Sequence, residues 1–169
     1  MPTSAFTKGA RMKGNEKLLP ALNALLADEL TAISQYMVHS EMCHHWGYQS
    51  LHQAIEKQAI DEMHHAEWLI QRILFLQGTP IVSKLNPLRL ADTVGDIIGN
   101  DQEAELAAVR AYNAAIRLSH ELDDQATGQL LTDILKMEEG HVHWAEEQRA
   151  QIQQMGLESY LSIQTTAAP

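Results

Sequence analysis

Six acidic and imidazole side chains recur at matching positions in the two halves of this 169-residue chain. The first half has a glutamate followed by a Glu-x-x-His motif, and the second half repeats both at the same spacing. The same number of residues, the repeat offset, therefore separates each member of the first set from its counterpart in the second. The six residues are Glu29, Glu62, His65, Glu105, Glu138 and His141. Residues three apart on a helix share a face, so the two side chains of each Glu-x-x-His pair can bind one metal ion together. The repetition predicts an internally duplicated site for two ions.

Each of these side chains interrupts an apolar stripe of helical period, which places it in the protein core. Burying carboxylates without compensating charge is unfavourable by several kcal/mol per ion, and two divalent cations would balance the four glutamates. Mixed carboxylate and imidazole ligands suit iron or manganese, whereas structural zinc usually takes thiolates. We therefore expect all six residues to be the metal ligands and catalytic residues of a di-iron site. Misplaced surface charges would explain one such motif, but not two at the same spacing.

The residues that start and stop helices, together with the long segments between them, predict an all-α protein. Long helices are expected over residues 15–46, 50–77, 92–122 and 124–155, and a short fifth C-terminal helix over 157–163. Gly47 and Gly156 are expected to end the first and fourth helices. Ser50 and Gln53 form a capping-box pattern at the start of the second.

The linker over residues 78–92 sets the predicted topology. It includes Pro80 and Pro87, which discourage a helix there. The helix before it is about 42 Å long at the usual helical rise, and an extended linker of this length reaches roughly 50 Å. The linker can therefore run the length of the bundle, so that the third helix starts parallel to the second. This predicts a four-helix bundle with one long crossover.

Composition narrows the functional classes. The chain has 22 acidic and 12 basic residues, a formal net charge of -10, and no Lys/Arg cluster, which disfavours nucleic-acid binding. No apolar run approaches the roughly 20 residues needed to cross a membrane. The single cysteine, Cys43, cannot form an internal disulfide, which fits a reducing cytoplasm. We expect one cytoplasmic domain.

Several segments resemble bacterioferritin, the haem-binding branch of the ferritins, over about residues 12–163. They are Met12-Lys13-Gly14, Asp28-Glu29-Leu30, Ile60-Asp61-Glu62-Met63-His64-His65-Ala66, Arg72-Ile73-Leu74-Phe75-Leu76, Glu138-Glu139-Gly140-His141 and Gln154-Met155-Gly156-Leu157. The resemblance implies a ferritin-like domain over 12–163, between an N-terminal extension (1–11) and a C-terminal tail (164–169). It further implies iron storage in a 24-subunit shell, where a ferroxidase centre oxidises Fe2+ with O2 or H2O2 and ferric mineral is deposited.

The same resemblance assigns roles within the site. Glu62 and Glu138 would bridge the two ions, with one histidine on each ion, and Tyr36 would lie beside them. Some relatives carry further ligands a turn before the second-helix glutamate, where this chain has Lys57 and Gln58. Only Asp61 remains as a candidate there, which makes an auxiliary inner iron site doubtful.

Met63 is the candidate haem ligand. It follows Glu62 directly, so it is turned about 100° around the helix from the metal-facing side. Thioether sulfur is a soft ligand that haem iron accepts, and a two-fold axis would bring two copies to one haem. The family match at Asp61-Glu62-Met63 implies one haem b per subunit dimer, with His64 as the competing ligand. The resemblance also implies a second bacterioferritin subunit type and a small ferredoxin reductant as partners.

Three other functions share parts of this pattern. A rubrerythrin-like peroxidase would normally add an iron domain held by four cysteines, and this chain has one cysteine. A DNA-protecting mini-ferritin would place its ligands between subunits and usually needs a basic tail. A non-catalytic haem carrier or shell subunit would not need a complete set of metal ligands, which this chain has.

Overall fold

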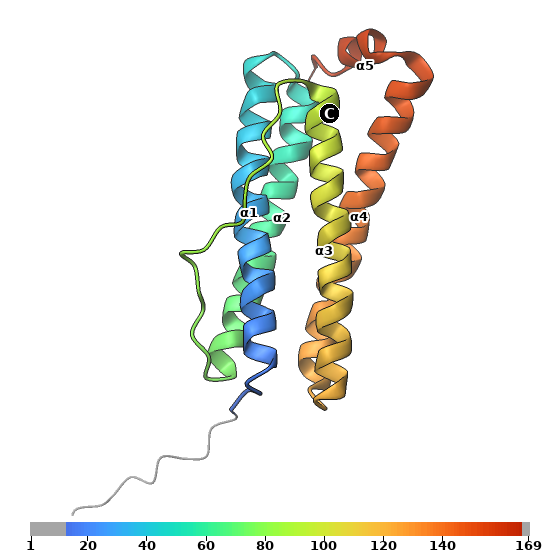
Figure 1. Ribbon diagram of the computed structural model, residues 1–169. Helices are drawn as coiled ribbons and strands as arrows, with labels where there is room; N and C mark the ends of the chain where they lie inside the picture. The colour runs from blue at the N-terminus through green and yellow to red at the C-terminus, as the bar shows by residue number, and fades with distance from the viewer. Residues whose placement is uncertain (1–12, 167–169) are drawn as a thin grey trace, which may run out of the picture.

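The computed structural model describes residues 13–166, and these form an all-helical bundle (Figure 1). The helices are α1 (Leu18–His45), α2 (Gln49–Phe75), α3 (Val94–Glu121), α4 (Gln125–Met155) and the short α5 (Leu157–Ile163). The predicted N-terminal extension, residues 1–11, and the last three residues of the predicted tail lie outside the described residues, so these boundaries remain predictions.

The crossover has the predicted course. After α2 ends, the chain returns along α1 to the opposite end of the bundle, where α3 begins (Figure 1). As a result α3 runs parallel to α2 and antiparallel to α1. Asn86 fixes the crossover to α1, because its backbone N–H donates to Thr31 Oγ1 at 2.8 Å and its side chain donates to Asp28 at 2.6 Å.

Most helices begin and end close to the predicted residues. The Thr93 hydroxyl accepts a hydrogen bond from the Asp96 N–H at the start of α3, and the Asp124 carboxylate accepts one from the Thr127 N–H at the start of α4. Gly47 and Gly156 have φ of 84° and 80°, the left-handed region that glycine enters without steric penalty. Both glycines end the helices they were predicted to end.

The predicted capping box at Ser50 is wrong. Helix α2 begins at Gln49 after Tyr48, and no side chain caps it. Instead the Ser50 N–H donates to the Gln164 carbonyl at 3.1 Å, and its hydroxyl donates to the Thr166 carbonyl at 2.7 Å. The C-terminal segment after α5 therefore supplies the partners that a local cap would have supplied.

Two apolar clusters fill the bundle on either side of its centre. One contains Leu22, Ile73 and Tyr112, and the other contains Cys43, Ile97 and Tyr160. Within residues 13–166, none of the helices combines the length and apolar character that a membrane crossing requires. The buried acidic side chains lie between two well-packed ends, which hold the four long helices in fixed register.

Replacement of Asp124 by Ala should lower the stability of the bundle. Asp124 caps α4 and also accepts a hydrogen bond from Arg72 of α2 at 2.8 Å. Loss of such a cap typically costs about 1–2 kcal/mol, which corresponds to a fall of roughly 2–8 °C in the midpoint of thermal unfolding. Asp133→Ala, at an exposed carboxylate inside α4, is the matched control and should stay within about 0.5 kcal/mol. Equal shifts for the two variants would contradict the capping role.

Candidate metal centre

All six predicted ligand residues converge at the middle of the bundle. Helix α1 contributes Glu29 and α3 contributes Glu105, while α2 and α4 each contribute a Glu-x-x-His pair. Every one of the six is buried, with exposed fractions between 0% for His65 and 8% for His141. The apolar stripes of the four helices must face inward, and these side chains share the stripes, so packing of the core brings them together.

The six residues form two overlapping groups. Glu29, Glu62, His65 and Glu138 offer ligand atoms that all lie within 4.8 Å of one another. Glu62, Glu105, Glu138 and His141 do the same. These are the two such groups among the residues that the structure describes, and Glu62 and Glu138 belong to both. The arrangement can hold two ions side by side with two shared carboxylates.

The imidazoles face the carboxylates through their Nδ1 atoms. His65 Nδ1 lies 2.7 Å from Glu62 Oε2 and 3.0 Å from Glu138 Oε1. His141 Nδ1 lies 3.0 Å from Glu62 Oε1 and 3.6 Å from Glu105 Oε1. Both histidines therefore direct the same ring nitrogen into the cluster.

Burial and mutual interaction shift the proton affinities of the cluster strongly. Burial opposes protonation of His65, but the carboxylates of Glu138, Glu29 and Glu62 outweigh it and raise the His65 pKa to about 12. Burial raises the pKa of Glu29 and of Glu105 well above the usual range. Burial also opposes ionisation of Glu138, yet the two histidines lower its pKa to about 2. Without metal, protons must supply the balancing charge.

Several atoms of the cluster that could ligate a metal ion are left without a hydrogen bond. Glu62 Oε1, Glu138 Oε1 and His141 Nδ1 are buried, and despite their close charged neighbours none makes a well-directed hydrogen bond. Such orphaned polar atoms are unfavourable in a protein core unless a ligand satisfies them. Carboxylate oxygens and imidazole nitrogens are the donors that iron and manganese accept. The residues present fit a pair of such ions.

Two tyrosines donate hydrogen bonds to Glu29 and Glu105, the outer glutamates, each of which belongs to only one of the two groups. Tyr36 of α1 donates a hydrogen bond to Glu105 of α3, and Tyr112 of α3 donates one to Glu29 of α1. Burial, together with nearby carboxylates, raises the pKa of both tyrosines well above 10, so both stay protonated donors. The family resemblance predicted Tyr36 beside the site, whereas Tyr112 was not among the predicted site residues. The repeat offset that relates the ligands also leads from Tyr36 to Tyr112 and would have identified it.

The Nε2 atoms of the two histidines are their outer ring nitrogens, which point away from the cluster, and they have different partners. His141 Nε2 lies 3.4 Å from Asp61 Oδ2, and His65 Nε2 lies 3.4 Å from Met137 Sδ. The Asp61 carboxylate also pairs with Lys57 at 2.6 Å. Burial opposes ionisation of Asp61, but Lys57 and His141 outweigh it and lower its pKa. Asp61 belongs to neither of the two groups found in the described part of the chain.

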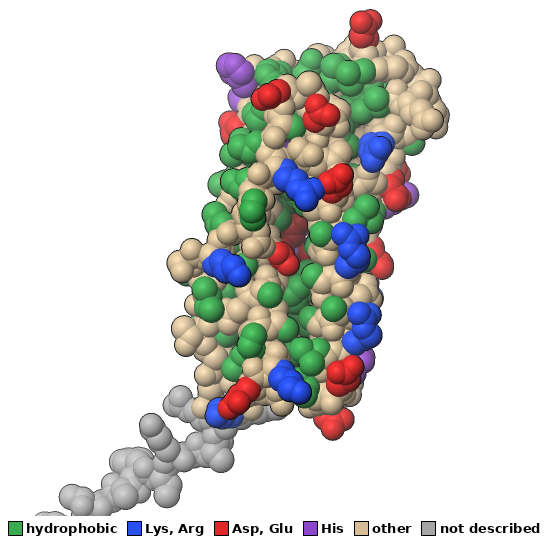
Figure 2. Space-filling view, in the orientation of Figure 1, with side chains coloured by type: hydrophobic (Ala, Val, Ile, Leu, Met, Phe, Trp, Pro, Cys, Tyr) green, Lys and Arg blue, Asp and Glu red, His purple; other side chains and the backbone are tan. Residues whose placement is uncertain are grey.

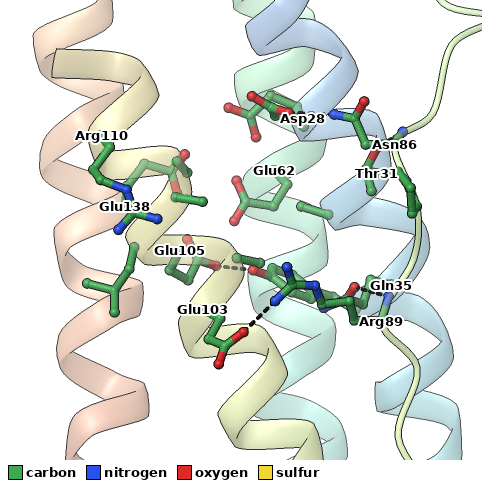
Figure 3. A pocket seen from close by; sticks show the side chains of 18 residues that line it. Asp28, Thr31, Gln35, Glu62, Asn86, Arg89, Glu103, Glu105, Arg110 and Glu138 are labelled. Carbon is green, nitrogen blue, oxygen red and sulfur yellow. Dashed lines mark hydrogen bonds and ion pairs between the residues drawn. The ribbon is translucent and has the colours of Figure 1, made fainter. Parts of the chain in front are cut away.

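A pocket of about 390 Å³ leads to the cluster from between α1, the crossover and α3 (Figure 3). Glu29, Glu62, Glu105 and Glu138 contribute to its lining. Arg89 of the crossover pairs with Glu103 of α3 beside it (Figure 3). On this face of the molecule, basic and acidic side chains are interspersed rather than gathered into a basic patch (Figure 2).

A four-helix bundle with one long crossover and two carboxylate–histidine groups at its centre defines a ferritin-like di-metal protein. Residues 19–155 match the ferritin-like domain family. The chain is 37% identical to a bacterial ferritin of Synechocystis sp., over 90% of this chain and 99% of that protein. It is 35% identical to the bacterioferritins of Brucella melitensis biotype 1 and Rhodobacter capsulatus, in each case over 94% of this chain and 97% of the relative.

The chain therefore belongs to the ferritin family. It is an iron-storage protein whose buried carboxylate–histidine site is typical of a ferroxidase centre. Family membership implies iron as substrate and an oligomeric shell. The predicted fold, family and general function are confirmed.

Binding of divalent metal to the centre should release protons near pH 7. With its pKa raised to about 12, His65 is protonated in the metal-free site, and Glu29 and Glu105 hold protons more tightly than ordinary glutamates. Metal ligation requires the deprotonated forms. Calorimetric titration with Co2+ in two buffers of equal pH but different ionisation enthalpy should give different heats.

Glu147→Gln is the matched control for this titration, because Glu147 is an exposed residue of α4 that pairs with His143. It should leave the proton release unchanged. Identical binding heats in the two buffers would show that the metal-free centre carries no displaceable protons.

Proposed function

We propose that Glu29, Glu62, His65, Glu105, Glu138 and His141 bind two ferrous ions as substrate and promote their oxidation. The observation that carries this proposal is the pair of overlapping groups that share Glu62 and Glu138. Sharing carboxylates keeps two ions close, at the separation of about 3.5–4 Å common in two-metal sites. Two neighbouring ferrous ions supply the two electrons that convert O2 to H2O2, or H2O2 to water.

The protein's own groups prepare the site for this reaction. The four glutamates neutralise the charge of two divalent ions, so the loaded centre adds no net charge to the core. Tyr36 and Tyr112 fix one carboxylate oxygen of Glu105 and Glu29 and leave the other oxygen for an ion. We further propose Tyr36 as a transient electron donor. The pocket beside the crossover gives Fe2+ and the oxidant a route to the cluster.

Storage requires that the oxidised iron be enclosed, and we propose a closed shell of 24 subunits in which ferric mineral accumulates. Apolar side chains left exposed on a single chain support extensive subunit contacts. They include Ile81, Val82, Leu85, Leu88 and Leu90 of the crossover and Leu157 and Ile163 of α5. A second bacterioferritin subunit type and a small ferredoxin reductant are proposed partners. We place the protein in the cytoplasm, in keeping with the free buried thiol of Cys43.

Replacement of Glu62 by Ala should abolish rapid iron oxidation, because both ions lose a shared ligand. The initial rate in stopped-flow oxidation of Fe2+ should fall to near the rate without protein, while sedimentation should still show assembled protein. Glu67→Ala removes an exposed carboxylate from the same helix and should leave the rate unchanged. A normal rate in assembled Glu62→Ala protein would refute the ligand assignment.

We also propose that Met63 ligates haem b, one haem per subunit dimer. Met63 is 43% exposed on α2, and Ile60, three residues earlier on the same face, is 46% exposed. A buried metal ligand would not be exposed in this way, whereas an axial ligand at a two-fold interface must be. The neighbouring His64 already has two surface contacts, because its Nδ1 lies 3.2 Å from Glu67 and its ring stacks with Trp68 at 6.4 Å between ring centroids. Bound haem would carry electrons inward to reduce stored ferric iron.

Haem binding should therefore depend on Met63 and not on His64. Assembled protein mixed with haem should give a low-spin b-type absorption spectrum, which Met63→Leu should eliminate and His64→Ala should preserve. Leucine keeps the apolar volume and removes only the sulfur ligand. Loss of the spectrum in His64→Ala alone would move the ligand to His64, and absence of binding to the unaltered protein would leave a haem-free ferritin.

A further inference from the structure

The contacts around the six ligand residues follow the internal duplication closely. Tyr36 reaches Glu105, and Tyr112, its counterpart in the second half, reaches Glu29 in the same way. Each ion position is offered one outer glutamate, the two shared glutamates and one histidine. These hydrogen bonds and ligand sets give neither position an advantage.

The outer ring nitrogens of the histidines break this symmetry. The residue that directly precedes each shared glutamate reaches across to the histidine of the other hairpin. Asp61, before Glu62, lies against His141, and Met137, before Glu138, lies against His65. The same repeat offset separates Asp61 from Met137, so they occupy equivalent places in the two halves. Both contacts measure 3.4 Å, but one partner is a carboxylate and the other a thioether.

The chemical difference between these partners bears directly on metal binding. A histidine that ligates metal through one nitrogen usually donates its other N–H to a carboxylate, a carbonyl or water, which raises the basicity of the ligating nitrogen. The 3.4 Å between His141 Nε2 and Asp61 Oδ2 is long for an N–H···O bond, and Lys57 pairs with the same oxygen at 2.6 Å. The carboxylate nevertheless remains a stronger acceptor for the His141 N–H than a neutral group would be. Thioether sulfur is only a weak, neutral acceptor.

We propose that Asp61 and Met137 make the two metal positions unequal, so that the His141 position binds its ion more tightly and the His65 position fills second. The inference rests on the proposed ligand set. Loss of such an outer partner typically weakens metal binding by about 10–100-fold, and we expect the two positions to differ by a factor in this range. Asp61 and Met137 act as positioning residues, because each works through a histidine.

The inequality has a consequence for the reaction. Oxidation by a two-electron oxidant needs both positions filled, so the weaker position sets the iron concentration at which ion pairs form. Iron at low concentration would occupy mainly the His141 position, where a single ferrous ion has no partner to share the oxidation. The thioether of Met137 thus raises the iron threshold for rapid oxidation.

Co2+ binding to the assembled protein tests this inference without turnover. Each position is isolated by removing the other histidine, and the dissociation constant is measured from the visible absorption of bound Co2+ and by calorimetry. His65→Ala, which keeps the His141 position, should bind Co2+ about 10–100-fold more tightly than His141→Ala, which keeps the His65 position. Equal constants, or the opposite order, would overturn the proposal.

Substitutions at the outer partners then test the cause. Added to His141→Ala, Met137→Asp should tighten Co2+ binding by about the same 10–100-fold. Added to His65→Ala, it should leave Co2+ binding essentially unchanged, because the histidine that Met137 contacts is absent. Met137→Leu, which keeps the apolar volume without an acceptor, is the matched control and should not tighten binding in either protein. Tightening of both positions by Met137→Asp, or of neither, would contradict the assigned contact.

A variant at Asp61 tests the other contact and is independent of whether the Met137→Asp protein assembles. Asp61→Asn preserves size while removing the charge, and in the His65→Ala protein it should weaken Co2+ binding, with the binding of His141→Ala unchanged. An unchanged constant in the first protein would overturn the proposal. Absence of any Co2+ binding to the unaltered protein would instead refute the proposed metal centre itself.

Discussion

The burial of four carboxylates at the centre of an apolar bundle is the constraint on which the rest of this structure depends. Such a cluster is stable only with compensating positive charge, supplied either by protons or by cations. Burial raises the pKa of Glu29 and Glu105, and the surrounding carboxylates raise that of His65, which favours protons in this role in the metal-free protein. Metal ligation requires the deprotonated groups, so bound divalent ions would take the place of those protons. The apolar clusters at either end supply the packing that holds the acidic centre in place.

The duplication explains why so much of the site was visible in the sequence. The six candidate ligands lie on four separate helices, but two Glu-x-x-His motifs and a single repeat offset relate all of them. The fold was predictable for a related reason, since Gly47, Gly156 and the two prolines of the crossover constrain the backbone locally. The predictions therefore succeeded where a residue's own chemistry or its repeat position carries the information.

The failures came from partners that are distant in the sequence. Ser50 has the side chain of a capping residue, yet its hydrogen bonds go to Gln164 and Thr166, which only the folded C-terminus brings within reach. Met137 is an unremarkable apolar residue of α4 until the bundle places its sulfur against His65. Tyr112 was overlooked because a tyrosine in an apolar stripe is usually a packing residue, and its hydroxyl reveals its role only once Glu29 lies opposite.

The long crossover accounts for how the two tyrosines enclose the centre. Because the chain returns along α1 before α3 begins, α1 and α3 run antiparallel (Figure 1). Each tyrosine follows its own helix's glutamate by about two turns, so antiparallel helices carry the two rings in opposite directions from the centre. Tyr36 accordingly packs in one apolar cluster and Tyr112 in the other. A direct connection would make α3 parallel to α1 and leave both tyrosines at one end. The crossover thus lets each apolar cluster position one hydrogen-bond donor against the metal site.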